Sequence, residues 1–358
     1  MKITANYFWQ NLSSFSDQIA LIDTSTNKSI TYKNLDVEAE KIASKLKSSD
    51  KALIFLFTTN NSESIISYIA ALSSGNAILL LDEKLNDEIR NNLIENYKPD
   101  YIISSNAIAP EFYSLLFKYE SLNFIKRTES NSINIFPELS VLLSTSGTTG
   151  SPKLVRLAYK NIQSNAESIA EYLQIDENER PITTLPINYS YGLSIINSHL
   201  LKGSAIVLTE RTVFFRDFWN QFNEYKCTSF AGVPYTYTML KRIGFEKIEL
   251  PTLKYFTQAG GKLSEEFIKH FHEYALNKKI KCFVMYGQTE ATARITYVPP
   301  EKLSDKIGSI GISIPYGELK ITNNETEITS PNEIGEIVYK GDNVMLGYAE
   351  TGNDLSKG

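Results

Sequence analysis

Continuous apolar runs alternate with amphipathic segments along the first third of the chain. Residues 52–58 and 77–81 carry almost only aliphatic and aromatic side chains. Such short runs are typical of strands that are buried on both faces of a sheet. Residues 30–47 and 63–73 place apolar side chains at every third or fourth position, which predicts helices. The pattern therefore predicts strands and helices that alternate with short connections.

The same alternation continues to about residue 298. Further helices are predicted at 88–96, 162–173 and 214–225, and further strands at 101–104, 154–157, 205–208, 253–257 and 283–285. Residues 121–138 are rich in Asn and Ser and lose this periodicity, so we expect a connector there. After residue 299 helical spacing disappears and short β segments follow.

This order of elements predicts an α/β fold in which mostly parallel sheets are covered by helices on both faces. A chain of 358 residues is too long for a single small core. We expect two packed α/β subdomains, residues 1–130 and 131–298, followed by a small β subdomain, residues 299–358.

Composition limits the classes of partner. The chain is 42% hydrophobic and 22% charged, as is usual for globular proteins, and its net charge of −5 argues against nucleic acid. The apolar runs are too short for a membrane span, and the first residues lack a secretory signal pattern. Cys227 and Cys282 are far apart and favour a reducing compartment, so we expect a cytoplasmic protein.

The most informative stretch is residues 144–153, which read STSGTTGSPK. Glycines let the backbone turn and aim N–H groups into one concavity, hydroxyls add donors, and Lys153 adds a cation. That combination suits a polyphosphate, although a flexible polar linker would use the same residue types. It is not a Walker A loop, because Pro152 rather than glycine precedes the lysine.

This decapeptide resembles the phosphate loop of the adenylate-forming superfamily, which includes acyl-CoA synthetases, adenylation domains of nonribosomal peptide synthetases and firefly luciferase. The resemblance implies that ATP is bound by Thr145, Ser146, Gly147, Thr148, Thr149, Gly150 and Lys153. It also implies that the two α/β subdomains form five layers, αβαβα, and that the third subdomain is a distorted β-barrel.

A second motif, YGQTE at residues 286–290, follows a predicted strand. An aromatic ring can stack on a purine, a hydroxyl can bind a phosphate oxygen, and a carboxylate can hold a hard divalent cation. The resemblance implies that Tyr286 stacks on adenine, with Gly287 beside the nucleotide, that Thr289 contacts the α-phosphate and that Glu290 holds Mg²⁺. On its own, the pentapeptide would also fit a strand-end turn with a solvated glutamate.

Three further segments resemble parts of the family's nucleotide and acyl sites. The turn at Ala259, Gly260 and Gly261 is implied to contact the nucleotide, although a plain turn is the alternative. The implied substrate pocket is lined by Tyr189, Tyr191, Gly232, Val233 and Pro234, although these residues would also fit core packing and a strand-to-helix turn. Residues 181–195 contain no Asp or Glu to pair a substrate ammonium, which argues against an α-amino acid.

Residues 335–348 resemble a β hairpin motif of the small subdomain. The Thr-Gly-Asp segment that follows in the family is not matched, because Asn353 stands in the place of its aspartate. The family's C-terminal lid domain, with the lysine that assists adenylation, is absent from these residues. We therefore expect slow adenylation from this large domain by itself.

Together the motifs predict activation of a carboxylic acid by Mg·ATP, with formation of acyl-AMP and pyrophosphate. A complete enzyme would pass the acyl group to CoA or to an acyl-carrier protein. Lys153, Thr289 and Glu290 would be catalytic through positioning and charge neutralisation. The alternative is a binding or scaffold module that holds nucleotide or acyl-adenylate without turnover.

Overall fold

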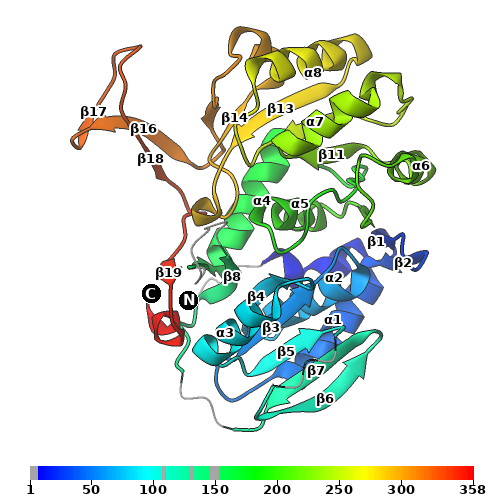
Figure 1. The fold of residues 1–358 in the computed structure, drawn as a ribbon, viewed down its shortest axis with the longest axis vertical. Coiled ribbons are helices and arrows are strands. Elements are labelled where there is room, and N and C mark those ends of the chain that lie inside the picture. The colour runs from blue at the N-terminus through cyan, green and yellow to red at the C-terminus, as the bar shows by residue number, and fades with distance from the viewer. Residues whose placement is uncertain (1–6, 107, 109, 130–132, 145–152) are drawn as a thin grey trace.

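The computed structural model describes residues 7–106, 108, 110–129, 133–144 and 153–358 (Figure 1). The helices are α1 Tyr32–Leu46, α2 Ser62–Ser73, α3 Asp87–Tyr97, α4 Tyr159–Leu173, α5 Ser190–Leu201, α6 Arg216–Glu224, α7 Pro234–Ile243 and α8 Glu265–Lys278. Of the helices in these ranges, none has the length and apolar character that crossing a bilayer requires.

The strands alternate with these helices along most of the chain. They are β1 Ile19–Asp23, β2 Lys28–Thr31, β3 Leu53–Thr58, β4 Ala77–Asp82, β5 Tyr101–Ser104, β6 Tyr113–Tyr119, β7 Leu122–Arg127, β8 Leu139–Ser144, β9 Leu154–Ala158, β10 Ile206–Leu208, β11 Ser229–Gly232, β12 Tyr255–Gln258, β13 Lys281–Tyr286, β14 Thr296–Val298, β15 Ile312–Ser313, β16 Glu318–Asn323, β17 Thr326–Glu327, β18 Glu336–Lys340 and β19 Gly347–Ala349.

The largest sheet has eight strands in the order β19-β9-β8-β4-β3-β5-β7-β6. Its centre, β8-β4-β3-β5, is parallel, and its margins are antiparallel. Successive residues of β3 face opposite sides: Ile54 and Leu56 pack with α1 and α2, whereas Phe55 and Phe57 pack with α3. Burial on both faces explains why this strand reads as a continuous apolar run.

The second large sheet has the order β11-β12-β13-β14-β15, and its first three strands are parallel. Helices α6, α7 and α8 cover one face with an aromatic cluster that includes Phe218, Trp219 and Phe271. Helices α4 and α5 lie between the two sheets, because Ile162 packs toward the first and Ile169 toward the second (Figure 1). The five-layer α/β arrangement is therefore confirmed.

Sheet membership does not follow the predicted division of the chain. Strands β8 and β9 lie beyond residue 130 but belong to the eight-stranded sheet, because they pair with β4 and with each other. Beyond residue 299, β15 extends the second sheet and β19 pairs with β9, so that only β16, β17 and β18 form a separate small sheet (Figure 1). The domain boundaries stay a prediction.

The connector predicted at residues 121–138 is wrong for residues 122–127, which form β7. This strand pairs antiparallel with both β5 and β6. Leu122 and Phe124 are buried, but Lys126 on the same face is exposed. The strand therefore lacks a sustained alternation of buried and exposed side chains. Hydrogen bonding to two neighbours, rather than a long apolar run, therefore fixes this strand.

A buried carboxylate ties β1 to the start of α2. Asp23 is 1% exposed and accepts hydrogen bonds from the backbone N–H and the hydroxyl of Ser62, both at 2.8 Å. It also accepts from the backbone N–H and hydroxyl of Ser25, at 3.0 and 2.6 Å. Burial raises the pKa of the Asp23 carboxyl group, but these hydrogen bonds outweigh burial, and the pKa lies below its usual value.

Replacement of this carboxylate should destabilise the fold in a pH-dependent way. In Asp23→Asn, an amide NH₂ group replaces one carboxylate oxygen and faces N–H and O–H donors instead of accepting from them. We therefore expect the free energy of unfolding at pH 7 to fall by about 1–3 kcal/mol. Because folding lowers the pKa of Asp23, its stabilisation is present above about pH 4 and is lost as the pH falls through the lowered pKa. Urea unfolding from pH 7 to pH 2 would measure both effects.

The matched control is Asp305→Asn, which changes an exposed carboxylate. The control should leave the unfolding free energy within about 0.5 kcal/mol of wild type. Equal losses in the two variants would show that the hydrogen bonds of Asp23 carry no special stabilisation.

Candidate active site

Part of the predicted phosphate site lies outside the described residues. These are Thr145, Ser146, Gly147, Thr148, Thr149 and Gly150. Lys153 is the first described residue after the loop, and β9 begins directly behind it. Of the residues predicted to bind phosphate in this loop, Lys153 is therefore the one whose contacts are described.

Lys153 and Glu290, which are far apart in sequence, both contact Tyr348. The hydroxyl of Tyr348 donates a hydrogen bond to Oε1 of Glu290 at 2.6 Å. The ammonium nitrogen of Lys153 lies 5.8 Å from the centre of the Tyr348 ring and 2.8 Å from Oε1 of Glu350. The two charged residues predicted from separate motifs therefore share one surface of the molecule.

Strand pairing explains this convergence. In the β19–β9 ladder, Tyr348 is directly opposite Val155, two residues after Lys153. The backbone N–H of Met345 donates to the carbonyl oxygen of Glu290 at 2.8 Å, which holds the approach to β19 against the loop that carries the glutamate. The long-range pairing of β19 therefore brings Glu290 to the start of β9.

The Lys153–Glu350 ion pair is weak because both side chains are exposed to solvent. The side chains are 58% and 61% exposed, respectively, and exposed pairs of this kind add little stability. Exchange of the Glu350 carboxylate for a phosphate oxygen would therefore cost Lys153 little. The geometry fits a lysine that is held near its place before a polyphosphate binds.

The loop after β13 folds back on itself through Gly287. A Cβ atom at this position would lie 1.9 Å from the carbonyl oxygen of Ala293, so no other residue fits without movement of the backbone. The return of the loop places Thr289 beside the start of α5, where its hydroxyl oxygen is 3.2 Å from that of Ser190. Tyr286 and Thr289 are both half-buried, as a contact site for a ligand requires.

The predicted substrate residues Tyr189, Val233 and Pro234 meet the predicted nucleotide turn. Gly260 has φ of +77°, and a Cβ there would lie 2.6 Å from the hydroxyl oxygen of Tyr189 and 3.0 Å from Val233. A Cβ at Gly261 would lie 3.0 Å from Pro234. The chain thus brings the implied acyl and nucleotide residues to one turn, which follows buried Ala259.

Two other predicted substrate residues are buried. Tyr191 is 2% exposed, and its hydroxyl oxygen is 2.7 Å from that of Thr257. Gly232 ends β11 and lies against the side chains of Thr236 and Tyr237. Both residues are thus packed against other protein groups, as the alternative of core packing expected. Their contact with substrate stays a prediction.

Asn343 was missed as a site residue. It is 3% exposed, and its amide donates to the carbonyl oxygens of Ala291 and Arg294, each at 2.8 Å. Its side-chain oxygen accepts from the hydroxyl of Tyr339 at 2.9 Å. One amide therefore fixes the loop that carries Thr289 and Glu290. The only sequence signal was its place inside the hairpin motif at residues 335–348.

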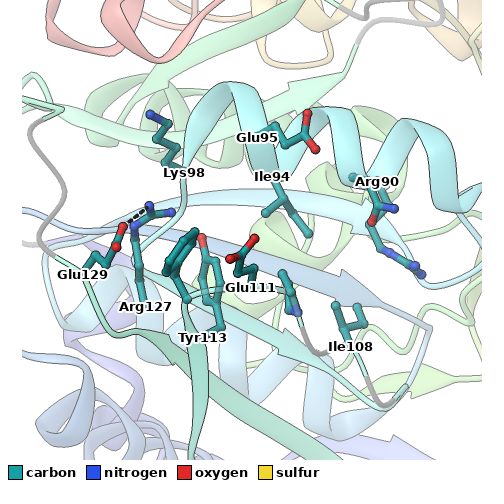
Figure 2. A pocket seen from close by; sticks show the side chains of 12 residues that line it. Arg90, Ile94, Glu95, Lys98, Ile108, Glu111, Tyr113, Arg127 and Glu129 are labelled. Carbon is teal, nitrogen blue, oxygen red and sulfur yellow. Dashed lines mark hydrogen bonds and ion pairs between the residues drawn. The ribbon is translucent and has the colours of Figure 1, made fainter.

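Two cavities among the described residues differ in their relation to the predicted site. A cavity of about 510 Å³ lies beside Val233, between Phe214, Tyr235 and Arg242. Another, of about 690 Å³, lies between α3 and the β6–β7 hairpin (Figure 2). Its arginines already have carboxylate partners, since Arg90 is 2.8 Å from Asp87 and Arg127 is 3.4 Å from Glu129. None of its lining residues belongs to the predicted site.

The possible metal ligands around Glu290 fit a site that the protein completes together with a bound phosphate, rather than a site made of protein side chains alone. Within the described ranges, no group of three His, Cys, Asp or Glu residues could hold a metal ion. Mg²⁺ prefers oxygen ligands and is commonly held by one or two carboxylates together with phosphates and waters. A single carboxylate at Glu290, near a cation suited to phosphate, agrees with that arrangement.

Comparison with known proteins identifies the family of this chain. The model of the AMP-binding enzyme family matches residues 8–349. The chain belongs to this family. The prediction of an adenylate-forming superfamily member is therefore confirmed.

Relatives and solved structures agree with that assignment. The chain is 29% identical to a 2-succinylbenzoate–CoA ligase of Oceanobacillus iheyensis, over 99% of this chain and 75% of the relative. It is 26% identical to the enzyme of that name from Bacillus subtilis, over 98% and 72%. A structure of o-succinylbenzoate CoA synthetase from Bacillus subtilis with ATP and magnesium has 25% identity and a TM-score of 0.74, over 95% and 72%.

A further solved structure shares the fold. The N-terminal domain of FACL13 from Mycobacterium tuberculosis superposes with a TM-score of 0.78 at 18% identity, and covers 95% of this chain and 89% of that domain. This member of the AMP-binding enzyme family therefore has the fold of a large N-terminal domain, as predicted.

Removal of the amide of Asn343 should destabilise the protein. Asn343→Leu would leave the carbonyl oxygens of Ala291 and Arg294 and the hydroxyl of Tyr339 without this partner in a buried place. We expect the free energy of unfolding to fall by about 2–4 kcal/mol. Chemical denaturation would measure the change. Asn353→Leu, at an exposed position, is the control and should stay close to wild type.

Proposed function

We propose that this chain catalyses ATP-dependent activation of a carboxylic acid, the first half-reaction of an acid–thiol ligase. The observation that supports it most directly is the meeting of Lys153 and Glu290 at Tyr348. Membership of the AMP-binding enzyme family supports it further, as do relatives named 2-succinylbenzoate–CoA ligase. By this similarity we propose CoA as the acyl acceptor, and an acyl-carrier protein is the alternative.

In the first step, a carboxylate oxygen of the acid attacks the α-phosphorus of ATP. The new oxygen–phosphorus bond gives acyl-AMP, the bond from the α-phosphorus to the bridging oxygen breaks, and pyrophosphate leaves with the electron pair. Charge accumulates on phosphate oxygens during this displacement. Lys153 would neutralise the polyphosphate, and the hydroxyl of Thr289 would bind the α-phosphate. Mg²⁺, which Glu290 would hold, supplies positive charge to phosphate oxygens when it is bound.

In the second step, the thiol sulfur of the acceptor attacks the acyl carbonyl, and AMP leaves. The thiol loses its proton and the acyl–oxygen bond to AMP breaks, which leaves a thioester. The residues for this step are less defined than those for the first, because the motifs gather around the nucleotide. The proposal for the acceptor therefore rests on the relatives.

Tyr348 prepares Glu290 for the reaction. The hydrogen bond to Glu290 raises the pKa of Tyr348 to about 12, so the phenol keeps its proton and remains a donor at neutral pH. The donor fixes one carboxylate oxygen and leaves the other to bind a cation. Similarly, Glu350 restrains Lys153 before ATP arrives. The two contacts hold the charged groups near their working positions, which lowers the cost of ordering them on binding.

The proposal predicts carboxylate-dependent exchange of pyrophosphate into ATP. Lys153→Met and Glu290→Gln should each lower the exchange rate about 10²–10³-fold, because each removes a charge that would stabilise the transition state. An acid panel should include 2-succinylbenzoate, simple aliphatic acids and aromatic acids. The measurement is incorporation of labelled pyrophosphate into ATP with each acid.

The matched control is Lys160→Met. Lys160 is also exposed and lies 2.7 Å from a carboxylate oxygen of Asp342, so it loses a similar ion pair away from Tyr348. The control should exchange at nearly the wild-type rate. If the protein binds ATP in calorimetry but no acid supports exchange, the chain is a nucleotide-binding module and the catalytic proposal is wrong.

A further inference from the structure

A buried arginine lies behind the predicted acyl residues. Arg294 is 2% exposed, and its guanidinium carbon lies 3.9 Å from the centre of the Tyr191 ring. One terminal nitrogen donates to the carbonyl oxygen of Ala293 at 3.4 Å. Its Nε atom is buried and has no hydrogen-bond partner among the described residues. Its Nε–H donor is therefore left unused, whereas Tyr172 forms a side-chain hydrogen bond with the same guanidinium.

This cation also lacks a carboxylate partner. In the described ranges no Asp or Glu lies within ion-pair distance of it, and the residues outside those ranges include no Asp or Glu. Glu179, whose charge reaches the nearby Tyr255, already pairs with Lys254 at 2.7 Å. A buried charge without a counter-ion is strongly unfavourable. The protein therefore keeps an uncompensated positive charge at this place.

The titratable groups around Arg294 are neutral, including its hydrogen-bond partner Tyr172, whose pKa is raised by burial. Burial raises the pKa of Tyr189 and of Tyr191, although the charge of Arg294 lowers both in part, so both phenols keep their protons. Burial lowers the pKa of His199 to about 4, so its imidazole is uncharged at neutral pH. The aromatic face of Tyr191 compensates the cation only in part. An anion could enter here without meeting negative charge.

A small cavity adjoins the guanidinium. It has a volume of about 20 Å³, and its lining includes Ala231, Tyr255, Thr257, His199 and Arg294. That exceeds the roughly 10–15 Å³ that one water needs, so an anionic group that reaches the cavity must be as small as a carboxylate. The Tyr191 ring, over which Arg294 lies, is 6.4 Å from the ring of Tyr189, and the Tyr189 hydroxyl is next to the turn at Gly260. One acid molecule could therefore extend from that turn to Arg294.

We propose that Arg294 is a specificity-determining residue that binds a second carboxylate of the substrate, so that the acid activated here is a dicarboxylic acid. This inference rests on the proposed function. The reacting carboxylate lies near Gly260 and Thr289, and the chain of the acid passes Tyr189. The distal carboxylate accepts a charge-assisted hydrogen bond from the unpaired Nε–H of Arg294.

The test compares each dicarboxylic acid with its monoamide, which has nearly the same shape but no distal charge. Pyrophosphate exchange with wild type should favour the diacid over its monoamide by at least about tenfold in kcat/KM. Arg294→Met should remove this preference and leave ATP binding, measured by calorimetry, unchanged. Arg294→Lys should keep part of the preference, because it retains the charge but not the planar fork.

Two arginine variants serve as comparisons. Arg180→Met changes a half-buried arginine that donates to the carbonyl oxygen of Tyr225, and it should keep the preference for diacids. Arg242 lines the cavity beside Val233. Loss of the preference in Arg242→Met, with Arg294→Met unaffected, would place the second carboxylate in that cavity and overturn the proposal.

Thermal unfolding separates this role from a structural one. Without ligand, Arg294→Met should melt no lower than wild type, because the variant removes an uncompensated buried charge. Diacids should raise the melting temperature of wild type more than their monoamides do, and this difference should vanish in Arg294→Met. If no acid supports exchange, the proposed function fails but this binding difference still tests Arg294. Equal shifts for diacid and monoamide in wild type would refute its role.

Discussion

The antiparallel pairing of β19 with β9 is the contact on which the candidate site depends. β9 begins directly after Lys153, and β19 returns Tyr348 from the C-terminal part of the chain to its side. Arg156 of β9, 3% exposed, strengthens this pairing through hydrogen bonds to the carbonyl oxygens of Leu346, at 3.3 Å, and Lys357. Loss of the pairing would remove the side chain that both Lys153 and Glu290 contact.

Much of the fold could be predicted because the central strands are buried on both faces. Such strands must be apolar throughout, and β3 and β4 therefore stand out in the sequence. The helix expected at residues 30–47 is α1, Tyr32–Leu46, because one face of it is buried at helical spacing. In contrast, β6 exposes Leu115 and Leu116, and β7 is short, so no clear alternation marks this hairpin. Sheet membership of β8 and β19 depends on long-range pairing, which local patterns do not contain.

The candidate site could be predicted only where short motifs were recognisable, such as the hydroxyl-rich loop at residues 144–153 and YGQTE at residues 286–290. Asn343 has a residue type that is common in exposed turns, and only its burial by the loop after β13 shows its structural importance. Arg294 would also be expected at the surface from its type. Its neighbours Ala293 and Ile295 are both buried, and an arginine between buried apolar residues was the one available signal.

Lys153 and Arg294 differ in solvent exposure, and this difference determines how strongly each cation can bind an anion. Lys153 is exposed, so water screens its contact with Glu350 and the lysine can change partners at little cost. Arg294 is buried, and neutral phenols and a neutral imidazole surround it, so an incoming anion would gain far more from it than from an exposed cation. The first environment suits a phosphate group that must leave as pyrophosphate, and the second suits a group that must be distinguished from neutral analogues. Nucleotide chemistry and choice of acid would thus be carried by two different charges, and Asn343 holds the loop that ends at the second of them.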